Sequence, residues 1–197
     1  MSPIISTIIA SGIPESLVAV VLLLPVLITL IAAIRQFIGF KAFGIYAALL
    51  LSFAFAALSL PVGVMFYTGS VIVGSLLASV MRRLKLHYLA RLALTLTLTS
   101  LAALAILSVA LKAGYMIPDS ISIFPVIVLV ILVEKVATTH FERGIMMAGY
   151  LALETGIIAA VCGSLILSAP LRDFLLNHPF WILLTIPINI LLGRSTG

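Results

Sequence analysis

The sequence predicts an all-α membrane protein with seven transmembrane helices, and three observations support this prediction. First, 63% of the 197 residues are hydrophobic and 9% are charged, with a mean hydropathy of +1.37, whereas soluble domains carry about 25% charged residues. Second, seven apolar segments approach the roughly 20 residues that cross a bilayer. Third, Lys and Arg gather in alternate connections between these segments, as they do in cytoplasmic loops. The net charge of +5 is therefore assigned to such loops and not to nucleic-acid binding.

The seven predicted spans are separated by Gly, Pro or polar residues that interrupt helices. They cover 15–35, 43–60, 62–82, 88–112, 120–137, 145–168 and 174–193. The second and third follow one another almost directly, so we expect a tight hairpin around Pro61. The opening MSPIISTIIASG is not a signal peptide, because it has no basic start and a short apolar run. We expect 1–197 to be one transmembrane domain cut from a longer protein, since the chain stops just after a membrane segment.

The basic residues predict that the N-terminus lies outside and the C-terminus in the cytoplasm. Lys112 and Arg172 fall on the predicted outer side. The other nine fall in the first, third and fifth connections or at the C-terminal end: Arg35, Lys41, Arg82, Arg83, Lys85, Arg91, Lys135, Arg143 and Arg194. An odd number of spans requires termini on opposite sides, so the span count and the charge distribution agree.

A shift of 100 residues aligns the first two predicted spans with the fifth and sixth. The matches include Pro25-Val26 with Pro125-Val126, Arg35 with Lys135, and Gly44-Ile45 with Gly144-Ile145. Either apolar segments match here by chance, or the chain holds a parallel repeat of three helices, a linker helix and three helices. In the third span, Ser70, Gly74 and Ala78 have the spacing of a helix-packing face.

Glu154 lies ten residues into the sixth span, near the middle of the membrane. A charged side chain at this depth faces protein or water, has a partner, and marks a functional site by default. Candidate partners are Asn189, Thr185 and the threonines of the fourth span. Glu154 either coordinates an ion or substrate, with Asn189 beside it, or is a protonated structural group hydrogen-bonded inside the bundle.

Two polar turns on the predicted cytoplasmic side are the other candidate sites. Glu134 and Lys135 follow about 13 apolar residues, fewer than a span needs. Either the helix continues through them to Thr139, or the chain dips into the membrane and returns. The candidate binding residues of these turns are Arg35, Lys41, Phe43, Gly44, Glu134, Glu142 and Arg143. Glu134 can pair with Arg35 or Arg143, and the helix start after Gly44 favours an anion. His140 reads as a solvated loop residue.

The sequence contains no catalytic constellation, metal-ligand spacing or nucleotide motif, so we expect neither an enzyme nor a cofactor. The single Cys162 can form no intrachain disulfide and reads as a small buried hydrophobe.

The stretches RQFIGFKAFGIYAALLLSFAF and FPVIVLVILVEKVATTHFERG resemble the bacterial seven-transmembrane-helix domain usually fused to an inactive transglutaminase-like domain. The closing LLGRSTG looks like the last turn of that domain. The family-like residues are Arg35, Gly39, Phe43, Gly44, Pro125, Glu134, Glu142 and Gly144. Ala42 stands where a hydroxyl residue is expected and Ala47-Ala48 where a proline is usual. A fainter similarity leads to the membrane subunit of poly-γ-glutamate capsule synthesis.

This resemblance implies a non-enzymatic module of the bacterial inner membrane that anchors a preceding periplasmic transglutaminase-like domain. Such proteins tend to be encoded near an ATP-grasp amidoligase and a retropepsin-like protease. The resemblance therefore implies work with a cytosolic amidoligase in making or exporting a peptide or an amide-linked polymer. In this interpretation Arg35 and Glu134 form the inner site and Glu154 lines the bundle. The alternative is a small-solute or peptide transporter with the helix plan of the sugar transporters called SWEETs.

Overall fold

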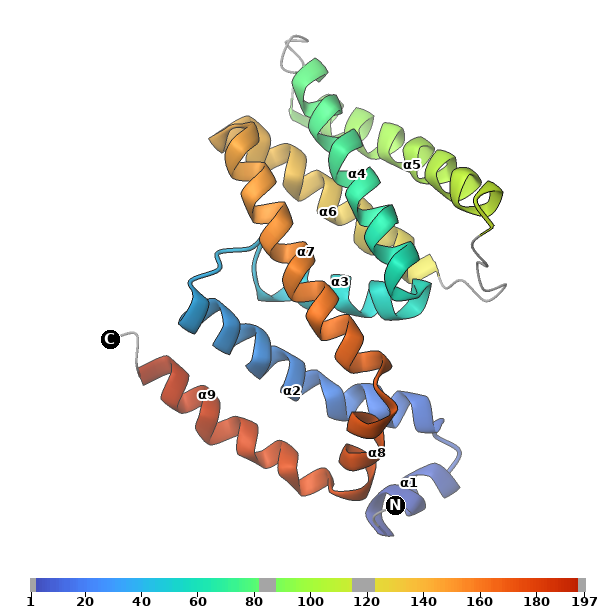
Figure 1. Ribbon diagram of the computed structural model, residues 1–197, viewed down its shortest axis with the longest axis vertical. Helices are drawn as coiled ribbons and strands as arrows, with labels where there is room; N and C mark the ends of the chain where they lie inside the picture. The colour runs from blue at the N-terminus through green and yellow to red at the C-terminus, as the bar shows by residue number, and fades with distance from the viewer. Residues whose placement is uncertain (1–2, 82–87, 115–122, 195–197) are drawn as a thin grey trace. The chain divides into compact units, whose positions relative to one another are not determined.

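The computed structural model describes residues 3–81, 88–114 and 123–194, and within these ranges it is helical with no strand (Figure 1). The all-α prediction is therefore confirmed. The basic residues Arg82, Arg83 and Lys85 of the predicted third connection lie outside the described residues.

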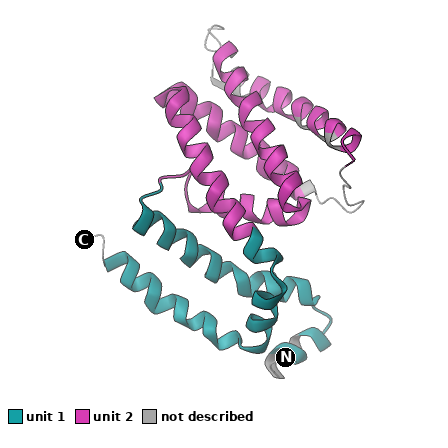
Figure 2. Cartoon of the chain, in the orientation of Figure 1, with its two compact units in different colours: residues 1–40, 164–197 teal, residues 41–163 magenta. Residues whose placement is uncertain are grey.

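The described chain forms two compact units, shown in Figure 2. The first unit joins residues 1–40 to 164–197, and the second comprises 41–163. That 1–197 acts as a single domain stays a prediction.

The first unit is built around α2 (Glu15–Ile38), which begins after Pro14 and ends at Gly39. Gly39 has the left-handed φ of 84°, and its N–H donates to the Arg35 carbonyl, which is a usual way to end a helix. The short α1 (Pro3–Ala10), which the sequence analysis did not predict, packs Ile5 into a cluster with Val18 and Ala19 of α2 and Leu176.

The predicted seventh span is broken into two arms. Its residues form α8 (Ala169–Asn177), then a 3₁₀ turn η1 (Pro179–Leu184) that continues as α9 (Thr185–Arg194), and the two arms meet at 97°. Pro179 causes the break, because proline has no N–H to donate and disfavours helical backbone at His178 before it. Accordingly His178 has φ −129° and ψ 64°.

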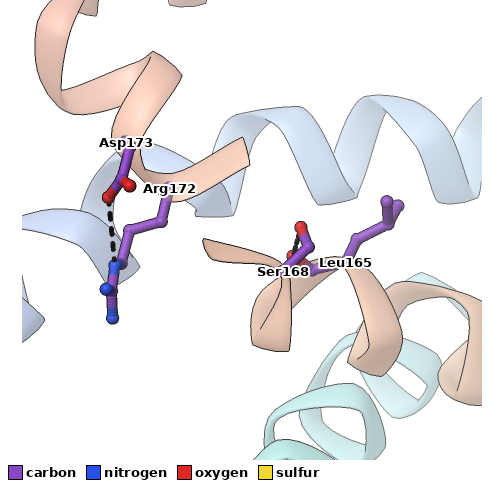
Figure 3. Close-up of polar contacts among 4 residues, drawn as sticks. All are labelled: Leu165, Ser168, Arg172 and Asp173. Carbon is purple, nitrogen blue, oxygen red and sulfur yellow. Dashed lines mark hydrogen bonds and ion pairs between the residues drawn. The ribbon is translucent and has the colours of Figure 1, made fainter. Parts of the chain in front are cut away.

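The start of α8 separates it from the helix before it (Figure 3). Ser168 Oγ donates to the Leu165 carbonyl at 2.7 Å. In the first turns of α8, Arg172 Nε and Asp173 Oδ1 lie 3.8 Å apart, and both side chains are about half exposed. Such an exposed pair adds little stability.

The second unit contains α3 (Ile45–Leu58), α4 (Leu60–Met81), α5 (Tyr88–Lys112), α6 (Ile123–Arg143) and most of α7 (Ile145–Leu167). The chain turns between α3 and α4 at Ser59, which has φ 69°. Pro61 lies in the first turn of α4, where its missing N–H costs nothing. The predicted tight hairpin is therefore present. The core of this unit includes Phe55, Phe66, Tyr67, Leu129 and Ala159.

Small residues let the helices of the second unit approach one another closely. Helices α4 and α6 run in the same direction (Figure 1). They approach closely at Gly74 of α4, where an added Cβ would lie 2.7 Å from Val133 Cγ1 of α6. Ser70 and Ala78 are buried on the same helix. These three residues thus form the predicted packing face. Likewise, a Cβ at Gly156 of α7 would lie 2.8 Å from the Tyr67 ring.

Seven helical segments occupy the seven predicted ranges, but only some could cross a membrane unaided. Among the described residues, four helices are long and apolar enough, namely α2, α4, α6 and α7, and the bent α8–α9 pair makes a fifth if it counts as one span. The 14 residues of α3 and the apolar part of α5 are shorter. Of the two alternatives at Glu134 and Lys135, the structure has the continuing helix, and α6 extends beyond the predicted ends at 137 and Thr139 to Arg143. The sides of the membrane and the repeat stay predictions.

Candidate functional site

The carboxylate of Glu154 binds the backbone of the segment that precedes α3. Its Oε2 atom accepts the N–H groups of Lys41 and Ala42, each at 2.8 Å. Glu154 lies in the middle of α7, so a helix residue holds a non-helical stretch more than 100 positions away in the sequence. Hydrogen bonds to a charged acceptor are about twice as strong as those between neutral groups. The carboxylate therefore holds the backbone of Lys41 and Ala42, the first residues of the second unit, against α7.

Thr155 extends this contact by one residue. Its Oγ1 accepts the Phe43 N–H at 2.9 Å and donates to the Leu151 carbonyl at 2.6 Å, and its side chain is fully buried. Three successive N–H groups are thus bound by two successive residues of α7, which we call the α7 clasp (Glu154 and Thr155). Backbone N–H groups outside helices need acceptors of their own, and the clasp supplies them for residues 41–43.

The backbone conformation explains how three consecutive N–H groups converge. Ala42 has φ 43°, in the left-handed region, and its small side chain is buried. Gly44 has φ 110° and ψ 167°, a combination that is essentially restricted to glycine. Successive residues of alternating hand form an anion-binding concavity from their amides. In this protein the anion is the carboxylate of Glu154.

Lys135 of α6 contacts the same segment. Its Nζ donates to the Phe43 carbonyl at 3.4 Å. The Phe43 ring packs against a cluster of Val136, Ala148 and Ala152. Phe43 is therefore held through its N–H, its carbonyl and its ring at once.

These charged residues lie well inside the helices and not at their ends. Lys135 precedes the end of α6 by about 12 Å, and Glu154 follows the start of α7 by about 14 Å, at 1.5 Å per residue. Both helices meet at the Gly144 turn, so the two residues lie at a similar depth from it. Charged groups at such depth within a span mark functional or structural centres. We call the set of Lys135, the α7 clasp and the backbone of 41–43 the charged layer.

The predicted partners of Glu154 have hydrogen bonds of their own. Asn189 is exposed, and its Nδ2 donates to Thr29 Oγ1 at 2.9 Å within the first unit. Thr185 Oγ1 donates to the Ile182 carbonyl. The hydrogen bonds of Glu154 within the second unit go to backbone amides, and its pairing with Asn189 or Thr185 stays a prediction. Residue spacing could not reveal amide donors, because they leave no side-chain signature.

The other candidate residues fall at separate places. Arg35 Nε donates to the Phe40 carbonyl at 3.4 Å, within the first unit. Glu142 and Arg143 are exposed at the end of α6. Arg143 lies about 14 Å from Glu134 along one helix, and within the described ranges no ion pair joins them. The Arg35–Glu134 pairing stays a prediction.

His140 differs from the prediction of a solvated loop residue. It belongs to α6 and is 4% exposed. The helix extends past the predicted boundary, so the histidine becomes part of its buried face. Cys162, by contrast, is buried as predicted.

Over the described ranges, no group of three His, Cys, Asp or Glu side chains could hold a metal ion.

Comparison with known proteins identifies one family. No curated protein and no solved structure matches the chain. A family model described as seven transmembrane helices usually fused to an inactive transglutaminase matches residues 13–197, nearly the whole length. The resemblance found in the two polar turns is thus confirmed, and the protein is a multi-pass membrane protein that belongs to this transglutaminase-associated seven-helix family.

Proposed function

We propose that this chain is a non-enzymatic membrane anchor for a transglutaminase-like domain, in the inner membrane of a bacterium. The observation that carries the proposal is the α7 clasp: the one acidic side chain of α7 holds the chain's own backbone at 2.8 Å. An acid used in this way stabilises the fold. A transporter would instead need that group to face a solute.

The anchored domain would lie on the outer side, before the first span, and a cytosolic amidoligase would work with the inner side. The α6–α7 turn is the part of the second unit best suited to receive it. Glu142 and Arg143 are exposed there, and Ile145 and Met146 beside them are 58% and 78% exposed. Charged residues beside exposed apolar ones are typical of protein-binding surfaces. The activity that this partnership serves would be synthesis or export of a peptide or an amide-linked polymer.

A co-purification experiment tests the partner. The Glu142→Ala/Arg143→Ala variant should lose a co-expressed ATP-grasp amidoligase, because it removes both charges of the turn. A matched control is Arg172→Ala/Asp173→Ala, which removes an exposed acid–base pair at the start of α8. Equal recovery of the ligase with both variants would exclude this turn as its docking surface. Loss with both would point to a general folding defect and would equally remove support for the turn.

A transporter remains the second candidate, because one feature favours it. Transporter sites are often formed where a helix is interrupted at membrane depth, and here the non-helical residues 41–43 contact Lys135 and Glu154 through their backbone. Uptake of labelled amino acids or short peptides into proteoliposomes discriminates the two. Uptake that is abolished by Lys135→Ala would support transport, and no uptake by the wild type would support the anchor.

A further inference from the structure

An apolar groove runs along the second unit between α4 and α7. Its volume is about 390 Å³, and its floor is formed by Phe55, Tyr67 and Ala152. Its rims are Val64 and Ile72 of α4 and Leu153 and Ile157 of α7, which are 37%, 55%, 62% and 46% exposed. The groove therefore opens sideways from the helices, in the direction in which a membrane protein meets lipid.

The few polar groups along the groove are already occupied. Tyr67 Oη donates to the Ala152 carbonyl at 2.7 Å. Thr68 Oγ1 donates to the Val64 carbonyl at 2.8 Å. What remains for a ligand is hydrocarbon surface, which selects an apolar occupant and excludes a peptide backbone with unsatisfied amides.

The dimensions indicate which apolar occupant fits. From Gly149 to Ala160 the groove follows α7 for about 16 Å at 1.5 Å per residue. One leaflet of a bilayer contributes half of a hydrocarbon core of roughly 30 Å, or about 15 Å. A transmembrane helix is about 10–12 Å wide, so the same length of helix fills on the order of 1,200 Å³, more than the roughly 820 Å³ of empty space in and just outside the groove. An acyl chain fits in length and width, whereas a helix does not.

We propose that the α4–α7 groove is a binding site for one acyl chain of a membrane phospholipid, which stays with the protein when it is extracted from the bilayer. Gly149 has no side chain, and a Cβ at this position would meet nothing within 4 Å. This end of the groove is therefore open. The bound chain would cover Tyr67 and Ala152 where α4 meets α7, and so would complete the packing between these helices. This proposal does not depend on the partner or on the anchoring role.

Native mass spectrometry of the detergent-purified full chain tests the site, with palmitoyl-oleoyl phosphatidylglycerol as the added probe. Wild type should retain one phospholipid. Gly149→Leu fills the groove from α7 and Thr68→Phe fills it from α4, and each should reduce the lipid-bound fraction at least tenfold. Gly193→Leu of α9 is the matched control, because a Cβ there also meets nothing within 4 Å, and it should bind as wild type does.

Circular dichroism of each variant shows that the helices remain, which both filled positions should permit because they are exposed. Lipid retention by Gly149→Leu and Thr68→Phe at the wild-type level would overturn the proposal. So would a wild-type protein that carries no phospholipid, or a lipid-free dimer that only wild type forms, because a second copy would then occupy the groove.

Discussion

At the scale of single residues, the carboxylate of Glu154 lies where an unpaired charge would be costly, and its two amide partners offset that cost. Glu154→Ala leaves the N–H groups of Lys41 and Ala42 without their acceptor. We expect a loss of about 1–3 kcal/mol in the free energy of unfolding, because Ala42 is buried and an unsatisfied buried group costs about 1–3 kcal/mol, whereas water can reach the exposed Lys41 amide. Glu154→Gln keeps an acceptor oxygen and should lose less, about 1–2 kcal/mol.

Unfolding by sodium dodecyl sulfate, followed by circular dichroism, measures both changes. Glu142→Gln is the control, since this carboxylate is exposed at the end of α6 and its change should stay within about 0.5 kcal/mol. An equal loss in Glu142→Gln and Glu154→Gln would mean that the clasp contributes nothing beyond net charge.

Thr155 allows the same contact to be tested without changing any charge. Thr155→Val has nearly the same shape but removes the acceptor for the Phe43 N–H, so we expect a loss of about 1–3 kcal/mol. Thr99→Val is a matched control, because Thr99 is also buried and its hydroxyl donates to the Thr95 carbonyl one turn earlier on its own helix. The same unfolding titration compares them, and equal destabilisation would count against the clasp.

The sequence predicts the importance of Glu154 but not its partners, and the reason is physical. An acid inside an apolar run is visible in any sequence, because its burial is costly. Its partners are amides of Lys41 and Ala42, and every residue except proline carries an amide. The flanking Gly39 and Gly44 are compatible with an unusual backbone there, and the sequence analysis predicted that this turn favours an anion, without naming Glu154 as that anion.

At the scale of elements, the start of α3 depends on Gly44. Its φ of 110° with ψ 167° is a conformation that other residues avoid. Gly44→Ala should therefore cost about 1–3 kcal/mol, although a Cβ there would meet nothing within 4 Å. Gly149→Ala is the control: it also has open space, but it lies inside a helix, where alanine gains about 0.5–1 kcal/mol. Thermal unfolding should separate the two variants in opposite directions, and a neutral Gly44→Ala would show that the segment adapts.

Two predicted span boundaries differ from the structure, one near charged residues in the fifth span and one at a proline in the seventh. The fifth span was predicted to end at 137, or as a helix at Thr139, because the polar residues after Lys135 were assigned to a loop; α6 continues through them to Arg143. Pro179 was passed over inside an apolar segment, and it breaks the predicted seventh span at His178. Apolarity located the segments, whereas backbone chemistry decided where each one ends.

At the scale of the whole molecule, the predicted repeat has local support at one point only. Gly44 and Gly144 both have positive φ, and each precedes a helix that starts at the next residue. The two helices then differ, with 14 residues in α3 and 23 in α7. In such a repeat, α3 of the first copy would be held at its start by Glu154 and Thr155 of α7 in the second copy. A parallel repeat therefore stays a prediction.

The membrane topology is the last prediction, and α3 decides it. Fourteen residues of helix span about 21 Å of a core of roughly 30 Å, so α3 crosses only if the clasped segment before it covers the remainder. In that case single cysteines at Ser11 and Ser59 should both react with a membrane-impermeant maleimide on intact cells, and Glu142→Cys should react only after permeabilisation. The native Cys162 is buried and should stay unlabelled. If α3 enters the membrane and returns, every later connection changes sides: Ser11→Cys and Glu142→Cys would label from outside and Ser59→Cys would not. That pattern would refute the seven-crossing topology and would place the α6–α7 turn beyond the reach of a cytosolic ligase.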